Sequence, residues 1–222
     1  MKLKRSLGQN FLTDSFFLEK IIQSSQIQKL DDVIEIGSGD GALTELILKK
    51  SNSLTAIEID QRFSEKLRKK HIDDNFQIHN KDFLKIDLNN INFEDKVVMG
   101  NLPYNVSSQI IFRLLESGLK FRHCVFLIQK ELANRFLTNQ KATKISIQCQ
   151  LFCEIEPLFD IPPDAFEPKT VETELTSADI PDEFKIGNDN KPVDDSKPTD
   201  EGKGIKLTKW MSRTDYMSKY PN

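Results

Sequence analysis

The sequence predicts an α/β domain built on a mostly parallel sheet, and two observations carry that prediction. Short apolar runs typical of buried strands alternate with longer segments of helical periodicity through most of the chain. Polar clusters directly follow two of these runs, at Gly37-Ser38-Gly39-Asp40-Gly41 and at Gly100-Asn101-Leu102-Pro103-Tyr104. Open α/β sheets place their ligands beyond the carboxyl ends of the strands, so we expect functional residues at these positions.

Seven strands and five helices are predicted in order. The first five strands cover residues 32–36, 54–60, 75–79, 96–99 and 124–129, and an alternating stretch over 145–153 is predicted as a long antiparallel strand. Residues 170–175 form a possible last strand. The first helix begins at a cap supplied by Thr13 or Asp14, and the second follows the glycine cluster over 42–48. The third starts at residue 61, and the last two cover 107–115 and 130–137.

The length of 222 residues favours one sizeable domain with an appendage. We place the domain at residues 1–175 and a polar linker or tail at 176–222. Residues 187–204 contain one aliphatic side chain and cannot bury enough surface to offset the entropy of ordering, so we expect disorder there. Residues 1–169 are neutral overall, so a nucleic-acid partner would have to be met by local basic patches.

Several classes of protein are disfavoured by composition. No apolar run approaches the roughly 18 to 20 residues of a membrane span, and the basic N-terminus lacks the apolar region of a secretory signal. Cys124, Cys149 and Cys153 lie in apolar runs without CxxC spacing, which predicts reduced core thiols. The three histidines show no metal-ligand spacing. We therefore expect a cytoplasmic protein without a metal site.

The glycine cluster is typical of a cofactor-binding loop between a strand and a helix. Its G-x-G-x-G spacing differs from that of dinucleotide sites, and Asp40 would repel a pyrophosphate, so a ligand without phosphate fits better. Glu58 ends the second strand 17 positions past Gly41, near the spacing of a carboxylate that holds ribose hydroxyls. Asp60 is better explained as a helix cap. The simpler alternative is a tight turn between strand and helix.

The second cluster suits a planar ring that carries an exocyclic amine. Asn101 offers a carbonyl acceptor, Pro103 has a fixed φ, and Tyr104 offers a flat face with a hydroxyl. A plain turn at the end of a strand is the alternative, because Asn and Pro are common turn residues. Asp82, just past the third strand, is in reach of an adenine amino group, or is a turn aspartate.

Seven short motifs occur in the order and approximate spacing of one known family. They are Gly8-Gln9-Asn10-Phe11-Leu12, Glu35-Ile36-Gly37-Ser38-Gly39-Asp40-Gly41, Glu58-Ile59-Asp60, Lys81-Asp82, Asn101-Leu102-Pro103-Tyr104, Gln129-Lys130-Glu131 and Pro162-Pro163-x-x-Phe166-x-Pro168. Over about residues 3–175 the chain resembles the ribosomal RNA adenine N6,N6-dimethyltransferases. It looks more like their small-subunit housekeeping branch than like the macrolide-resistance relatives.

The resemblance implies a class I S-adenosylmethionine-dependent methyltransferase fold, Rossmann-like, that dimethylates adenine N6 in ribosomal RNA. In such enzymes the target amine would donate to the Asn101 side chain and the Leu102 backbone carbonyl, beside Pro103. The base would stack on Tyr104 and Phe166. The residues implied in binding S-adenosylmethionine are Asn10, Leu12, Gly37, Gly39, Glu58, Asp82 and Asn101.

The partner that the resemblance implies is ribosomal RNA in the small ribosomal subunit, met by a monomer without membrane contact. The family's small helical C-terminal domain is expected to be missing, with the polar tail in its place. Two alternatives stay open on that account. One is a non-catalytic ribosome-assembly or transcription factor derived from the family, and the other is a methyltransferase that acts on another substrate.

Overall fold

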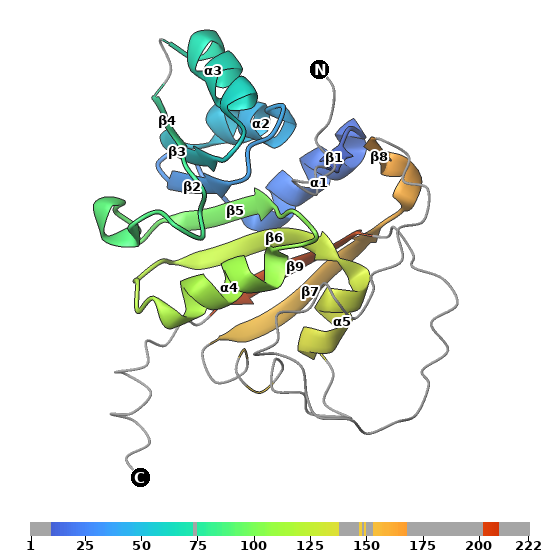
Figure 1. Cartoon of the computed structure of the whole chain (residues 1–222). Helices are drawn as coiled ribbons and strands as arrows, with labels where there is room; N and C mark the ends of the chain where they lie inside the picture. The colour runs from blue at the N-terminus through green and yellow to red at the C-terminus, as the bar shows by residue number, and fades with distance from the viewer. Residues whose placement is uncertain are drawn as a thin grey trace.

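The computed structural model describes residues 10–72, 75–137, 147, 149 and 153–167, and the backbone of 202–208. A seven-stranded sheet lies between layers of helices, and a small two-stranded sheet lies beside it (Figure 1). The helices are α1 (Ser15–Ser25), α2 (Ala42–Lys50), α3 (Gln61–Lys70), α4 (Ser107–Glu116) and α5 (Lys130–Leu137), with short 3-10 turns η2 (Leu88–Asn90) and η3 (Pro163–Ala165). The strands are β1 (Phe11–Leu12), β2 (Asp32–Ile36), β3 (Ser53–Glu58), β4 (Phe76–Asn80), β5 (Val97–Asn101), β6 (His123–Gln129), β7 (Glu154–Ile161), β8 (Phe166–Glu167) and β9 (Gly202–Thr208).

The large sheet has the strand order β4-β3-β2-β5-β6-β9-β7. Neighbours from β4 to β6 are parallel, and β9 runs antiparallel to both β6 and β7. The prediction of a mostly parallel seven-stranded sheet with a final antiparallel strand is therefore confirmed. Strand β3 pairs with one side of β2, and β5, which comes later in the chain, pairs with the other side. Such a reversal opens a crevice at the carboxyl ends of these two strands, where open α/β folds bind their ligands.

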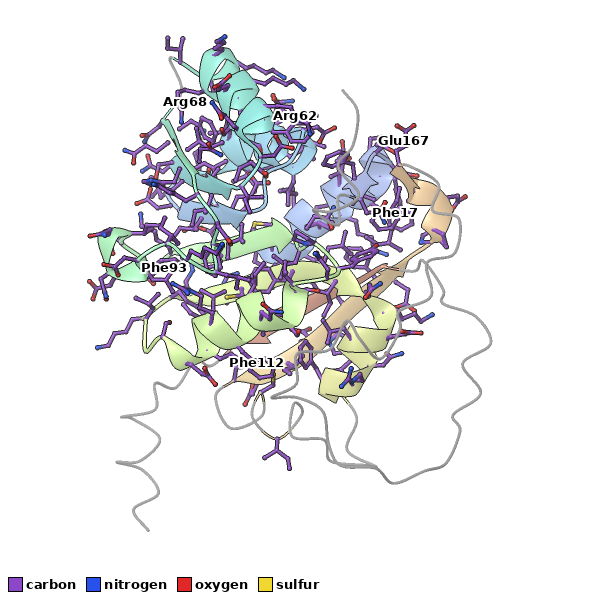
Figure 2. All side chains as sticks on the ribbon, in the orientation of Figure 1. Phe17, Arg62, Arg68, Phe93, Phe112 and Glu167 are labelled. Carbon is purple, nitrogen blue, oxygen red and sulfur yellow. The ribbon has the colours of Figure 1, made fainter. Side chains whose placement is uncertain are left out.

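The sheet separates two hydrophobic clusters, because successive residues of a strand point to opposite faces. On β2, Val33 packs with residues of α1 and α2, whereas Ile34 packs with residues of α4 and α5. Phe93 and Phe112, labelled in Figure 2, belong to the cluster on the α4 side. Both faces are thus covered, as a parallel sheet requires.

The helices begin at the caps expected from the sequence. The Asp14 carboxylate accepts a hydrogen bond from the Phe16 backbone N–H at 2.8 Å, and Asp60 accepts from Arg62 N–H at 3.1 Å. Each bond satisfies a donor that the first helical turn leaves unpaired. Among the described helices, none combines the length and the apolar character needed to cross a membrane.

The prediction of a long strand over residues 145–153 is wrong at the positions that the structure describes. Ile147 and Cys149 are helical, the Cys153 N–H donates to the Cys149 carbonyl at 2.9 Å, and β7 begins at Glu154. The two buried cysteines are four residues apart, which is also the spacing of one helix face, while Ile147 is 47% exposed. Over so short a stretch, the alternation of apolar and polar residues did not distinguish the period of a strand from that of a helix.

The prediction of a linker or tail after residue 175 is wrong for residues 202–208. These residues form β9, which pairs with β6 from Gln129↔Gly202 to Cys124↔Leu207 and with β7 on its other side. The alternating residues Ile205, Lys206 and Leu207 stand at the end of a polar stretch, so composition averaged over that stretch concealed a strand. The predicted strand at 170–175 lies outside the described residues.

Gly100 fixes the distance between the central strands β2 and β5. A Cβ atom at this position would lie 2.4 Å from the Ile36 carbonyl oxygen, a separation that side chains do not tolerate. The next residue but one, Leu102, is 1% exposed, and its N–H donates to the Leu127 carbonyl at 3.0 Å. The turn that starts at Asn101 is therefore held on both sides by backbone contacts of the sheet.

Replacing Gly100 by alanine should push β5 away from β2. We expect the free energy of unfolding in urea to fall by roughly 1 to 3 kcal/mol, the usual cost of an overpacked core. Gly118→Ala is the matched control, because Gly118 has a φ of +69° with open space around it. That control should lose about 1 kcal/mol from backbone strain alone. Ligand binding in the crevice should weaken in Gly100→Ala and stay intact in Gly118→Ala; equal binding by both variants would contradict this account.

Candidate active site

A cavity of about 290 Å³ lies at the carboxyl ends of β2, β3 and β5. Its lining includes every residue that the sequence assigned to cofactor binding: Asn10, Leu12, Gly37, Gly39, Glu58, Asp82 and Asn101. Leu102 and Pro103 of the second polar cluster also line it. The fold thus brings residues from widely separated segments to one place.

The glycine loop passes under the N-terminal strand. Gly39 has a φ of +52°, and a Cβ there would lie 2.6 Å from a ring carbon of Phe11. The Phe11 ring also packs edge-on against Phe63 of α3, with ring centroids 5.5 Å apart. Gly37 lies against the second cluster, since a Cβ on it would be 3.6 Å from the Asn101 carbonyl oxygen. The loop and the Asn101 turn are therefore direct neighbours.

Glu58 anchors this loop from the end of β3. Its Oε2 accepts a hydrogen bond from Gly39 N–H at 2.8 Å, and its Oε1 accepts from Asp60 N–H at 2.7 Å. Burial raises the pKa of the Glu58 carboxyl, while these two bonds act in the opposite direction. The Ile59 backbone also donates to this carboxyl. Because a carboxylate offers about four lone-pair positions, capacity for a ligand hydroxyl remains.

Glu35 is a buried acid in the cavity wall that the sequence analysis did not single out. It is 1% exposed, and its Oε2 accepts a hydrogen bond from the Thr44 hydroxyl at 2.6 Å. Burial raises the pKa of Glu35 to about 8, and the nearby Glu58 and Asp40 carboxylates add to the effect. A charged residue inside the apolar run of β2 is the signal that could have found it.

Asp82 acts as a turn aspartate and also lies in the cavity lining. Its Oδ1 accepts a hydrogen bond from Leu84 N–H at 2.9 Å, as a turn aspartate does, and the residue also lines the cavity. Its Oδ2 lies 3.6 Å from the Lys85 ammonium. The Arg113 guanidinium of α4 donates to the carbonyls of Leu84 and Ile86, which ties this loop to the body of the domain.

The Asn101 turn is held by the N-terminal strand. The Asn101 side-chain Nδ2 donates to the Asn10 carbonyl at 3.0 Å, and the Asn10 side-chain Nδ2 donates to the Tyr104 hydroxyl at 3.0 Å. The Ser107 hydroxyl donates to the Tyr104 carbonyl at 3.2 Å, which joins the turn to the start of α4. The segment is a turn, as the simpler interpretation expected, and it also forms one wall of the cavity.

Two residues predicted to stack on a base do not line the cavity. Phe166 of β8 is 1% exposed and packs in the core cluster on the α1 side, opposite Leu12 in the β1–β8 pair. A ring buried in this way presents no face to a ligand, so the stacking role predicted for Phe166 conflicts with its position. Tyr104 is half-buried and reaches the site through its contact with Asn10.

The donors and acceptors of the cavity fit S-adenosylmethionine, which carries a sulfonium, an amino-acid group and a ribose. Two buried polar atoms in the lining have no hydrogen-bond partner among the described residues, Asn10 Oδ1 and Ser38 Oγ. The acidic lining residues, Glu35, Asp40, Glu58 and Asp82, outnumber the single lining lysine, Lys81. An acidic wall disfavours a pyrophosphate and accepts a positively charged ligand. Three further lining residues, like Glu35, had no role predicted from the sequence: Ser38, Ile59 and Asn105.

Comparison with known proteins gives one consistent family. The family model described as ribosomal RNA adenine dimethylase matches residues 1–179. The chain is 36% identical over 195 residues to a protein of Mycoplasma mobile named ribosomal RNA small subunit methyltransferase A, covering 86% of this chain and 73% of the relative. A protein of the same name from Neisseria gonorrhoeae is 35% identical over 189 residues, with coverage of 84% and 73%.

Solved structures agree on the fold. A dimethyladenosine transferase from Plasmodium falciparum superposes with a TM-score of 0.68 at 25% identity, covering 89% of this chain and 62% of that one. The 23S rRNA methyltransferase ErmE gives a TM-score of 0.68 at 20% identity, with coverage of 91% and 70%. The chain therefore spans about two thirds to three quarters of the length of these proteins.

The buried Glu35 should make folding stability depend on pH. Its pKa rises from a usual value of 4.5 to about 8 on folding, so the folded state binds more protons between these values. Stability from this group is thus complete below about pH 4.5 and is lost as the pH rises toward 8, by at most about 1.4 kcal/mol per pH unit. Glu35→Gln keeps the shape and cannot ionise, so urea unfolding of this variant should show a flatter profile over that range. Identical profiles for the two proteins would refute a neutral buried Glu35.

Proposed function

We propose that the cavity holds S-adenosylmethionine beside a target adenine of small-subunit ribosomal RNA. The chain belongs to the ribosomal RNA adenine dimethylase family. It is thus an S-adenosylmethionine-dependent rRNA adenine N6,N6-dimethyltransferase. Adenine N6 would be presented by the turn from Asn101 to Tyr104. Small-subunit RNA is favoured by the name that the Mycoplasma mobile and Neisseria gonorrhoeae relatives share.

The orientation of the Asn101 amide is the observation that carries this proposal. Its nitrogen is committed to the Asn10 carbonyl, which leaves the oxygen Oδ1 as the group that can accept a hydrogen bond at the cavity wall. An exocyclic amine is a donor of two hydrogen bonds and matches such an acceptor. Asn101 is in turn fixed by the sheet through Gly100.

The chemical task of the protein is to orient a weak nucleophile. The lone pair of adenine N6 is delocalised into the ring, and hydrogen bonds from the amine to Asn101 Oδ1 and the Leu102 carbonyl would draw the nitrogen toward tetrahedral geometry. Pro103 stiffens the turn that carries both acceptors. Because the reacting groups are then aligned in one cavity, the protein contributes mainly through orientation. Tyr104 would hold the base by stacking, as enzymes that act on single bases do.

S-adenosylmethionine supplies an activated methyl group to this site. Glu58 would accept its ribose hydroxyls with the lone pairs that the Gly39 and Asp60 amides leave over. Asp82, which also lines the cavity, would accept its adenine amine. The Gly37–Gly39 backbone, Asn10 and Leu12 would enclose the remainder.

We also propose that the protein acts as a monomer in the cytoplasm. The three cysteines are unpaired and buried, which suits a reducing compartment. Residues 1–175 would form the methyltransferase domain, with β9 supplied from residues 202–208.

The decisive experiment measures transfer of labelled methyl groups from S-adenosylmethionine to unmethylated small ribosomal subunits, followed by digestion of the RNA to nucleosides. We expect N6,N6-dimethyladenine. Cofactor binding without transfer would instead support the non-catalytic assembly factor. Methylation of a free oligonucleotide but not of subunits would support a methyltransferase with another substrate.

Two substitutions should separate the two halves of the site. Asn101→Ala removes the proposed acceptor for the amine, so transfer should fall by at least about 100-fold, as for loss of a positioning group. Its dissociation constant for S-adenosylhomocysteine, measured by calorimetry, should change little. Full transfer by Asn101→Ala would eliminate the proposed amine contact.

Glu58→Ala should instead weaken cofactor binding. The affinity for S-adenosylhomocysteine should fall about tenfold or more, because ribose and loop contacts are both lost.

A further inference from the structure

Asn10 contacts both polar side chains of the turn that presents the substrate. Its backbone oxygen accepts from Asn101 Nδ2, and its side-chain Nδ2 donates to the Tyr104 hydroxyl, each at 3.0 Å. The first contact sets which end of the Asn101 amide faces the cavity. The second sets where the Tyr104 ring lies. One residue from the N-terminal strand thus controls two groups that act on the adenine.

The remaining side-chain polar atom of Asn10 is unsatisfied within the described part of the chain. Asn10 Oδ1 is buried and has no hydrogen-bond partner among the described residues, while Asn10 lines the cavity. Leaving such an atom unpaired costs roughly 1 to 3 kcal/mol, so a ligand that donates to it gains a matching advantage. S-adenosylmethionine has hydroxyl and ammonium donors that can do so. The Asn10 amide thus has Nδ2 paired with Tyr104, and it leaves Oδ1 to be satisfied by a donor from outside the described residues.

Strand β1 limits how far Asn10 can move. Phe11 and Leu12 pair with β8, and the Ala165 carbonyl accepts hydrogen bonds from Thr13 N–H at 3.0 Å and from Asp14 N–H at 3.3 Å. The Asn10 backbone is thus held at one edge by a small sheet, and its amide side chain is held by the bond from Nδ2 to Tyr104. A group that binds Oδ1 adds a second contact to the same amide.

We propose that Asn10 is a positioning residue that couples cofactor binding to capture of the adenine. A cofactor donor at Oδ1 locks the Asn10 amide in the orientation in which Nδ2 already holds Tyr104, so the ring is fixed more firmly for the base. Because coupling free energies are reciprocal, the RNA in turn tightens cofactor binding by the same factor. This inference rests on the proposed function, and it adds a role to Asn10 beyond contact with the cofactor.

The test measures the affinity for unmethylated small ribosomal subunits with and without saturating S-adenosylhomocysteine. The ratio of the two dissociation constants is the coupling factor. It is measured for the wild-type chain, Asn10→Ala, Tyr104→Phe and the double variant. Tyr104→Phe removes only the hydroxyl that Asn10 contacts and keeps the ring. Thr13→Ala is the matched control, because it loosens the same strand at the Thr13 hydroxyl contact with Ala165, 3.3 Å, without touching the turn.

We expect a coupling factor of at least about fivefold in the wild type and in Thr13→Ala. It should fall to near one in Asn10→Ala and in Tyr104→Phe, with no further loss in the double variant. Tyr104→Phe should unfold at the same urea concentration as the wild type, which shows that it is folded. Steady-state methylation by this variant should show a raised KM for subunits with a smaller change in kcat.

Three results would each overturn the inference. The first is a wild-type coupling factor in Asn10→Ala, and the second is a coupling factor of one in the wild type. The third is a double variant in which the losses of coupling caused by the two single substitutions multiply. In all three cases a wild-type chain that methylates subunits leaves the proposed function standing. A wild-type chain that binds S-adenosylhomocysteine but transfers no methyl group overturns the proposed function, and the inference fails with it.

Discussion

The close backbone contact between β2 and β5 at Gly100 is the constraint on which the rest of the site depends. It brings the ends of the two strands so near that a Cβ on Gly100 would lie 2.4 Å from the Ile36 oxygen. The glycine loop that follows β2 and the turn that follows β5 are consequently neighbours, with Gly37 against the Asn101 carbonyl. A loop suited to a cofactor and a turn suited to an amine thus share one cavity because of how two parallel strands pack.

The cavity also gathers acidic groups in a poorly solvated place. Glu35 and Glu58 are 1% and 4% exposed, and burial raises the pKa of both carboxyls. The protein offsets part of this cost by local donors, the Thr44 hydroxyl for Glu35 and two backbone amides for Glu58. A positively charged ligand relieves what remains. Perturbed acids of this kind collect at functional sites, where stability is sacrificed for binding.

The sequence predicted the parts of the molecule in which local pattern and tertiary structure agree. Strands β2 to β6, the caps at Asp14 and Asp60, and the cavity positions of Gly37, Glu58 and Asn101 all follow from periodicity and from residues just past strand ends. It failed where long-range pairing decides. Strand β9 is held between β6 and β7, with which it pairs on either side. Phe166 is buried where β8 pairs with β1. Neither partner is visible from the residues themselves.

The small β1–β8 sheet shows why a site can depend on contacts that no local motif contains. Asn10 enters the cavity only because Phe11 and Leu12 pair with residues some 155 positions later in the chain. This pairing involves two residues on each strand and a few bonds to Ala165, whereas the main sheet has seven strands. Leu12 and Phe166, which face each other in this pair, are 3% and 1% exposed and belong to the same core cluster as Val33 of the main sheet. The place of Asn10 in the cavity lining therefore depends on core packing as well as on the pairing of two short strands.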